Sequence, residues 1–485
     1  MSTTAPTPTP TPTPAPTSPG GLLPMLERQR VAALHDGPPS ASARRADLTR
    51  LGKALIQHER EVGEAISRDF GHRSSQESTL ADLWPTVTSI KYLARHVGPW
   101  IKPERREVPL HFLPGRAWVE SQPLGVVGII SPWNYPLSLA LVPLATAIAA
   151  GNRVMVKPSE YTPETSALMT ELLGGLFPAE QVVVVNGGPE VGAAFSSLPF
   201  DLLFFTGSTS VGRMVMRAAS ENLVPVILEL GGKSPALVDT DYPLEHAARS
   251  IAHGKLVNAG QTCIAPDYVL LPAENAEKFV ALYVEQAQTL YARWRSNPDY
   301  GAIVNQRHFD RLQKLVSDAR GRGARVIEVD GGAEASPDVG VRKFPPTILL
   351  GVTDEMTVMQ DEIFGPILPV KTYRDLPEAL TYINEHPRPL ALYYFGRSSD
   401  RQRAVLSGTT SGGVTINDTA MHYFQDALPF GGVGASGIGS YHGVEGFRAF
   451  SHRKAVFRQS RFNTVDLLRP PYGKRFDRIL KLLMR

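Results

Sequence analysis

Residues 121–152 form a stretch without any charged residue or histidine, long enough to raise the question of a membrane-spanning helix. Three prolines interrupt its interior: Pro132, Pro136 and Pro143. Because proline disrupts the interior of a helix, the stretch fits a buried strand at 125–130, a turn at 131–136 and a buried helix at 137–150 better than a membrane span. We therefore expect this segment in the core of a globular domain.

Strands and helices continue to alternate after this segment, and a helical region at 22–100 precedes it. The next expected elements are strands at 153–157, 182–186, 202–206 and 226–230 and helices at 163–176, 189–197 and 209–219. A second alternating region extends to about residue 420, with helices near 243–258, 274–291, 305–322 and 376–386. Repeated units of this length imply right-handed crossovers and a largely parallel sheet with helices on both faces, so the sequence predicts an α/β protein.

The charge balance and the cysteine content narrow the class of protein. Fifty Lys plus Arg against 47 Asp plus Glu leave a net charge of +3, too small to favour nucleic acid as a partner. Cys263 is the only cysteine, which excludes an intramolecular disulfide and every metal site built on paired cysteines. No metal is expected, and a reducing cytoplasm is the expected location.

The two ends of the chain differ from the rest. Residues 1–21 are rich in Pro and Thr and are expected to form a disordered tail, with no secretory signal. The segment 452–485 carries ten Lys or Arg against two Asp, a balance of +8, so the remainder carries 3 − 8 = −5. This basic C-terminal region is interpreted as a solvated charged face, and membrane contact is not expected.

Two glycine-rich segments are candidates for a phosphate-binding loop. Gly432, Gly434 and Gly437 match the dinucleotide fingerprint in spacing, but no strand precedes them, so we interpret them as a closely packed loop. The segment from Gly207 to Gly212 does lie between an apolar strand and a helix. It fits a phosphate held at a helix N-terminus or, with no ligand, a helix capped by Ser208 or Thr209.

Polar residues follow two other strands. Lys157 and Glu160 lie at the carboxyl end of an expected strand, where they are suited to ribose hydroxyls and where the carboxylate would repel a 2′-phosphate. Cys263 follows a probable turn and is either a small buried hydrophobe or a nucleophile. As a nucleophile it needs a base, for which Glu229 and Glu362 are candidates. The Asn134 amide is either an N–H donor in a cleft or part of a proline-flanked turn.

Taken together, these segments resemble the aldehyde dehydrogenase superfamily from about residue 25 to about residue 460. The motifs that carry the resemblance are PWNYP, KPSE, FTGSTSVG, LELGGKSP with NAGQTC, and EIFGP followed by the PFGG-to-SGIG stretch. The class 3 and coniferyl aldehyde dehydrogenase branch is the most similar, because of residues 263–268 and the late segment 469–472.

The resemblance implies a role for each motif residue. Cys263 corresponds to the nucleophile, Glu229 to the general base, with Glu362 as a second candidate base, and Asn134 with the backbone N–H of Cys263 to the oxyanion hole. The cofactor contacts implied are Trp133, Lys157, Glu160, Gly207, Ser208, Thr209, Gly212, Glu362 and Phe364. The reaction implied is oxidation of an aldehyde, aromatic such as coniferyl aldehyde or of medium to long chain, through a thiohemiacetal and a thioester. NAD is the expected cofactor because of Glu160, and the sequence leaves NADP open.

The resemblance also implies a domain plan. It has a Rossmann-like cofactor-binding domain, a second α/β catalytic domain and a small β extension for oligomerisation. The expected ranges are 22–108 and 130–230 for the cofactor domain, 231–425 for the catalytic domain, 109–129 and 426–465 for bridging segments, and 466–485 for the basic tail. A symmetric homodimer is expected through residues 110–121 and 447–457.

Other interpretations of the sequence remain at this point. A coenzyme A-acylating or semialdehyde dehydrogenase has the same fold, although acylating relatives generally lack the base at Glu229. A cysteine hydrolase would use Cys263 with His253 and leave the cofactor segments unexplained. A catalytically idle member would be unexpected with the whole set present. Four residues are either walls of an aromatic substrate cavity or ordinary core: Tyr135, His422, Tyr423 and Phe430.

Overall fold

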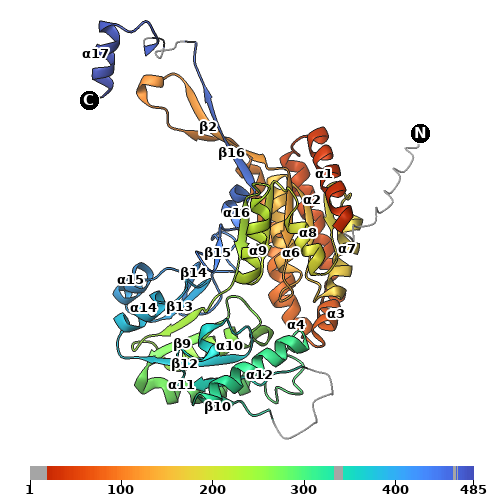
Figure 1. Ribbon diagram of the computed structural model, residues 1–485, viewed down its shortest axis with the longest axis vertical. Helices are drawn as coiled ribbons and strands as arrows, with labels where there is room; N and C mark the ends of the chain where they lie inside the picture. The colour runs from red at the N-terminus through yellow and green to blue at the C-terminus, as the bar shows by residue number, and fades with distance from the viewer. Residues whose placement is uncertain (1–18, 332–341, 462–465, 467, 485) are drawn as a thin grey trace, which may run out of the picture.

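The protein consists of two α/β bodies and a β-sheet arm that projects from them (Figure 1). The computed structural model describes residues 19–331, 342–461, 466 and 468–484. The Pro/Thr-rich residues 1–18 lie outside the described residues, and so does the prediction of disorder made for them. A short 3-10 helix, η1 (Pro19–Gly21), begins the described chain, so the prediction of a disordered tail over 1–21 is wrong for its last three residues.

The first body is a six-stranded sheet in which all neighbours pair in parallel except β15. Its strands, in spatial order, are β15 (Gly437–Ile438), β7 (Val226–Glu229), β6 (Leu202–Thr206), β3 (Val126–Ile130), β4 (Arg153–Lys157) and β5 (Val182–Val184). The chain runs outward from β3 through β4 to β5 and then returns to the other side of β3 with β6 and β7. The topological switch point, where ligands of such sheets bind, therefore lies between β3 and β6.

Helices cover both faces of this sheet, as the sequence predicted. In β3, Val127 and Ile129 belong to one apolar core, and Val126 belongs to another on the opposite face. The helices of this body are α1 (Leu22–Asp36), α2 (Ala41–Gln57), α3 (Glu59–Phe70), α4 (Ser75–Ser78), the π-helical turn η2 (Thr79–Leu83), α5 (Trp84–Trp100), α6 (Ser138–Ala150), α7 (Pro163–Leu176), α8 (Pro189–Ser196) and α9 (Thr209–Ser220). Every residue of α6 is buried, so the uncharged run is an internal helix as expected.

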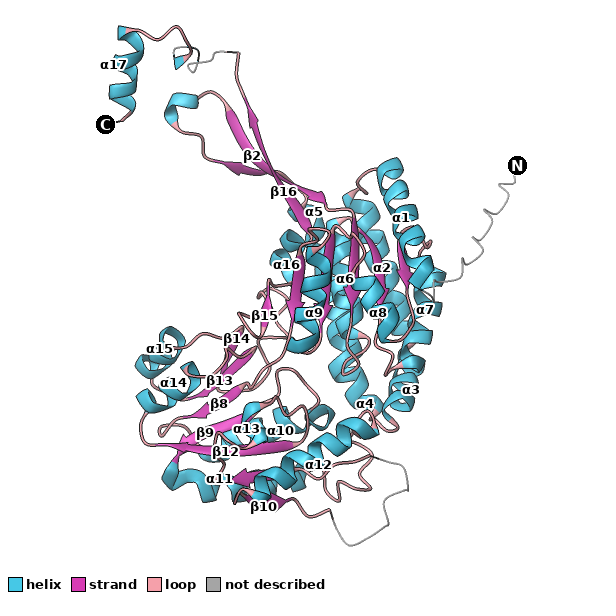
Figure 2. Cartoon of the chain, viewed as in Figure 1, coloured by secondary structure: helices cyan, strands magenta, loops and turns pink. Residues whose placement is uncertain are grey.

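The second body contains a seven-stranded sheet, drawn in Figure 2. It has its own apolar core. In spatial order its strands are β10 (Arg325–Glu328), β11 (Thr347–Leu350), β12 (Ile367–Tyr373), β9 (Tyr268–Pro272), β8 (Pro235–Val238), β13 (Ala391–Phe395) and β14 (Gly413–Ile416). Its helices are α10 (Leu244–Leu256), η4 (Val257–Gly260), η5 (Ala273–Asn275), α11 (Ala276–Leu290), α12 (Gln306–Gly321), α13 (Thr357–Gln360), α14 (Leu376–Asn384) and α15 (Ser399–Gly408). The α/β class is thus confirmed in both bodies.

The arm is a three-stranded antiparallel sheet in the order β1 (Glu104–Arg106), β2 (Arg116–Pro123) and β16 (Ser451–Arg458). The short helix η3 (Leu110–Phe112) lies at its turn, and α17 (Lys474–Leu483) lies beyond its tip (Figure 1). Among the described residues, no helix combines the length and apolar composition that a bilayer crossing requires.

Two of the expected domain boundaries need correction. The boundary between residues 129 and 130 cuts β3, whose five residues all pair within the six-stranded sheet. The segment 426–465 is not only a bridge, because β15 pairs with β7 and α16 (Gly443–Ala449) packs on α5 and α6. The first boundary is wrong because it divides one continuous apolar strand, and the second because edge pairing and helix docking depend on distant partners, which local sequence patterns do not record.

Candidate active site

Three motifs meet at the carboxyl edge of the six-stranded sheet. The segment 131–136 follows β3, Lys157 ends β4, and Gly207 follows β6. Because β4 and β6 flank β3, these segments lie side by side at the switch point. Glu229 ends β7 beside them, and its carbonyl accepts a hydrogen bond from Gly207 N at 3.0 Å.

The edge around β4 and β6 fits a dinucleotide. The helix α9 begins after Ser208, whose hydroxyl accepts from Val211 N at 3.4 Å, so the capped-helix interpretation holds, and the first N–H groups of the helix remain suited to an anion. A Cβ on Gly212 would lie 2.7 Å from a Leu230 methyl carbon, so glycine permits this close packing of α9 on the chain after β7. Lys157 Nζ, buried at the strand end, lies 3.2 Å from Glu160 Oε2.

A second group of expected cofactor residues comes from the other body. The Trp133 and Phe364 rings meet edge to face with centroids 5.4 Å apart. Phe364 adopts a positive φ of 50°, and Arg311 donates to the carbonyl of Glu362 at 3.1 Å, which together fix this loop. A Cβ on Gly231 would lie 2.2 Å from Glu362 Oε2, so the glycine makes room for that carboxyl group.

The second body presents the amino ends of its strands to the carboxyl edge of the sheet in the first body. Gly231 and Gly232 precede β8, Cys263 precedes β9, and Glu362 precedes β12, and these three strands are neighbours. The loops before them therefore converge on one place. Sequence patterns placed polar residues at strand ends but did not indicate that the second sheet would contribute through its amino ends.

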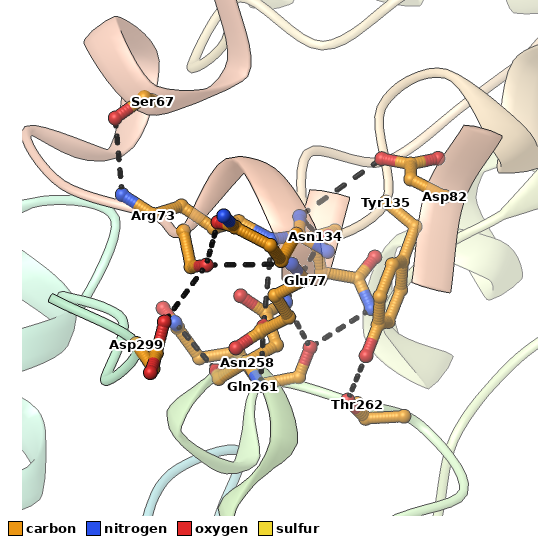
Figure 3. Close-up of polar contacts among 12 residues, drawn as sticks. Ser67, Arg73, Glu77, Asp82, Asn134, Tyr135, Asn258, Gln261, Thr262 and Asp299 are labelled. Atoms are coloured by element: carbon orange, nitrogen blue, oxygen red, sulfur yellow. Dashed lines mark hydrogen bonds and ion pairs between the residues drawn. The ribbon is translucent and has the colours of Figure 1, made fainter. Parts of the chain in front are cut away.

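Asn134 is joined to the chain segment that carries Cys263. Asn134 Nδ2 donates to the carbonyl of Gln261 at 3.1 Å, and the Tyr135 hydroxyl contacts Thr262 Oγ1 at 2.7 Å (Figure 3). One N–H of the Asn134 amide is thereby used, and the second is left for another acceptor. Asn134 is almost fully buried.

Acidic groups with raised pKa surround the thiol. Burial raises the pKa of Cys263 to about 12, and the charges of Glu362 and Glu229 act in the same direction. Burial raises the pKa of Glu229 well above its usual value and, with the charge of Asp267, raises the pKa of Glu362 to about 8. Among the described residues, both Glu229 oxygens and Glu362 Oε1 have no hydrogen-bond partner. The thiol thus keeps its proton until a base removes it, and a carboxylate of raised pKa is a stronger base.

A cavity of 540 Å³ leads from Cys263 to the surface, and its walls are mostly apolar. Five aromatic residues line it: Trp84, Tyr135, Tyr291, Tyr423 and Phe424. Trp84, Tyr291 and Phe424 were not predicted, because they come from helices and loops far apart in sequence. Trp84 is half exposed, a property that the structure shows and the sequence does not.

Some of the other residues singled out from the sequence line the cavity, and others lie in the core. Tyr135 and Tyr423 line the cavity, whereas His422 and Phe430 are buried and stack on each other with centroids 5.9 Å apart, so they belong to the core. His253 lies on the cavity wall, but the groups that act on the Cys263 pKa are carboxyls and backbone N–H groups. The Gly432 loop is closely packed as predicted, since a Cβ there would lie 2.0 Å from the Ser436 carbonyl oxygen.

Comparison with known proteins agrees with this geometry. The model of the aldehyde dehydrogenase family matches residues 38–456. The chain belongs to the aldehyde dehydrogenase family. It is 52% identical over 462 residues to a probable coniferyl aldehyde dehydrogenase of Pseudomonas aeruginosa, with 95% of this chain and 96% of that protein covered. It is 47% identical to the coniferyl aldehyde dehydrogenase of a Pseudomonas species, with 95% of each chain covered.

Solved structures of this family are similar throughout. AldH of Staphylococcus aureus in a substrate-bound state superposes with a TM-score of 0.89 at 37% identity, covering 95% of this chain and 99% of that one. The NAD+ complex of a Bacillus cereus aldehyde dehydrogenase superposes with a TM-score of 0.82 at 28% identity, covering 91% and 89%. This aldehyde dehydrogenase is therefore an oxidoreductase that acts on aldehydes with NAD(P)+.

The raised thiol pKa gives a direct prediction. In the cofactor-free protein, Cys263 should react slowly with iodoacetamide near pH 7, because the thiolate is the reactive form, and the rate should increase about tenfold per pH unit with no plateau up to about pH 10. At a fixed pH above about 8, where Glu362 is ionised, Glu362→Gln removes a negative charge that raises the thiol pKa, so alkylation should become faster. Alkylation is followed by intact mass. A plateau below about pH 9, or an equal acceleration by the distant control Glu221→Gln, would contradict this account.

Proposed function

We propose that this enzyme oxidises aromatic aldehydes of the cinnamaldehyde class, such as coniferyl aldehyde, to the carboxylic acids. The observation that carries the proposal is the mostly apolar cavity at Cys263, whose walls include five aromatic rings. A planar ring gains from stacking and edge-to-face contacts there, which a saturated chain makes less well. The names of the relatives at 47% and 52% identity support the same substrate class.

We propose that Cys263 attacks the aldehyde carbon and that Asn134 with the backbone N–H of Cys263 binds the oxyanion of the thiohemiacetal. Such donors act only on the charge that develops, and losing one typically costs about 3 to 4 kcal/mol of barrier. Bound NAD(P)+ supplies the acceptor for the hydride that the aldehyde carbon gives up. The thioester left on Cys263 is then hydrolysed by water that Glu229 deprotonates.

Glu229 is proposed as the main general base in preference to Glu362. Its two carboxyl oxygens have no hydrogen-bond partner among the described residues, so they are available to a water molecule. The Glu362 carboxyl accepts a hydrogen bond from the backbone N–H of Gly232. This bond and the positive charges of Lys233 and Arg311 lower the Glu362 pKa and so weaken it as a base. Glu362, together with Phe364 and Trp133, is assigned to the nicotinamide side of the cofactor, and Lys157 and Glu160 to the adenosine ribose.

The assignment of the base predicts a pH dependence. Glu229 must lose its proton to act, and burial raises its pKa, so kcat should increase as the pH rises through this raised pKa. Glu229→Gln should lower kcat about 10²- to 10⁴-fold and remove this limb of the profile. Glu362→Gln should keep the limb and mainly raise KM for NAD+. If Glu362→Gln removes the limb instead, the two assignments are reversed.

The substrate class is tested by ranking aldehydes. Cofactor reduction followed by absorbance should give kcat/KM for coniferyl aldehyde at least about tenfold above that for a straight-chain aldehyde of similar length, since one aromatic contact is worth about 0.5–1.5 kcal/mol and several line the cavity. Trp84→Ala should lower kcat/KM for coniferyl aldehyde several-fold and leave that for propanal nearly unchanged. A ranking that favours straight chains, with no effect of Trp84→Ala, would refute the aromatic preference but not aldehyde oxidation.

We also propose that the enzyme is a cytoplasmic homodimer joined through the arm. The strand β16 forms one open edge of the arm sheet. Leu110, in the turn between β1 and β2, is 84% exposed. Long open edges and exposed apolar residues are usually covered by a partner. A single cysteine that must stay reduced agrees with a reducing compartment.

The dimer predicts a solution mass of about twice the 52.8 kDa of one chain by light scattering after gel filtration. Leu110→Glu should increase the monomer fraction, because it places a charge where the partner is expected. Leu223→Glu is the matched control. This leucine is also exposed, at 92%, but it follows α9 in the first body, away from the arm. A monomeric wild type would refute the proposal.

A further inference from the structure

Arg73 is a fully buried arginine that neither the reaction nor the cofactor uses directly. It lies in the loop between α3 and α4, with its guanidinium against the rings of Phe70 and Tyr135 at 5.3 and 4.9 Å. Its Nε lies 3.5 Å from Glu77, and its Nη1 lies 3.9 Å from Asp82 (Figure 3). Burying a charge costs several kcal/mol unless it is paired, and the carboxyl groups of Glu77 and Asp82 offset part of this cost for Arg73.

The same guanidinium reaches the backbone of the oxyanion-hole residue. Arg73 Nη1 donates to the carbonyl of Asn134 at 3.0 Å, and Asn258 Nδ2 donates to the same oxygen at 2.9 Å. The side chain of Asn134 is held at its other end by Gln261. The backbone and the amide of this residue are thus fixed independently, which aims the remaining amide N–H.

The ion pair also holds the turn that leads to the nucleophile. Asn258, Ala259 and Gly260 have positive φ values of 53°, 49° and 76°, which cost roughly 1–3 kcal/mol for each residue other than glycine. Glu77 Oε1 accepts a hydrogen bond from Asn258 N at 2.7 Å, at the first residue of this turn. The carboxyl group that tethers the strained turn is therefore the partner of the arginine that holds Asn134.

We propose that Arg73, paired with Glu77, is a positioning residue that keeps the Asn134 amide and the Cys263 turn in the relative placement that the reaction requires. This inference rests on the roles proposed above for Asn134 and Cys263. Removing the guanidinium leaves Glu77 as a buried carboxyl without its counter-charge and frees one donor on the Asn134 carbonyl. A displacement of about 1 Å at reacting groups is enough to cost about 100-fold in rate.

The experiment compares Arg73→Met with Arg44→Met. Arg44 serves as the control because it is also a buried arginine that donates to backbone carbonyls. Its acceptors are Pro39 and Ala149, at 2.9 and 3.0 Å, and neither belongs to the turn before Cys263. Rates are normalised to the folded fraction of each variant, measured by gel filtration and by the amplitude of its thermal unfolding transition. Arg73→Met should lower kcat/KM for the aldehyde about 10- to 100-fold, with KM for NAD+ within about twofold of wild type, whereas Arg44→Met should keep kcat/KM within about threefold.

A second variant protects the test against poor folding and probes the ion pair. In Arg73→Met/Glu77→Gln the buried charge is removed, and the glutamine oxygen still accepts the Asn258 N–H, so part of the activity lost by Arg73→Met should return. The proposal is overturned if the normalised kcat/KM of Arg73→Met equals that of Arg44→Met, if KM for NAD+ rises as far as kcat falls, or if the double variant recovers nothing.

Two further variants in the same assay separate this inference from the function on which it rests. Cys263→Ala and Asn134→Ala should abolish or strongly reduce oxidation of every aldehyde that the wild type accepts. If they retain activity, the roles assigned to the site are wrong. If they lose activity while Arg73→Met does not, the site roles stand and only the role of Arg73 is refuted.

Discussion

Desolvation of the acidic groups at the junction of the two sheets is the constraint on which the site depends. Burial raises the pKa of the Cys263 thiol and of the carboxyls of Glu229 and Glu362 together. A thiol in this state is protected from non-specific chemistry, and a carboxylate there becomes a base strong enough to activate water. The same burial that would be a defect in an ordinary core thus gives the reacting groups their properties.

The architecture explains how these groups come together. Asn134 and Glu229 lie at the carboxyl edge of the six-stranded sheet. Cys263 and Glu362 lie on the loops before the strands of the seven-stranded sheet. A site shared by two bodies requires contacts that fix one body against the other. Hydrogen bonds provide them here: Asn134 is bonded to Gln261 and Asn258, and Glu77 is bonded to the backbone of Asn258.

Much of the fold could be predicted because its determinants are local. The strands at 153–157 and 202–206 and the helix at 163–176 coincide with β4, β6 and α7, where apolar runs, proline and charge mark the ends. The pairing of β15 with β7 could not be predicted, because two residues of a glycine-rich loop carry no strand signal. The motif residues of the site were accessible from the resemblance. Arg73 and the aromatic cavity walls were not, since their meaning lies in contacts between segments far apart in sequence.

The residues assigned to the cofactor and most of the residues that line the cavity come from different elements, although Tyr135 shares the segment after β3 with Trp133. The former follow β3, β4 and β6 and precede β12, whereas Leu80, Trp84 and Met421 stand on η2, α5 and a late loop. Evolution can therefore rebuild the entrance for a new aldehyde without disturbing the redox half of the molecule. Such a division offers a simple route by which one ancestral scaffold diversifies, and it marks the entrance as the part to redesign when a different aldehyde is wanted.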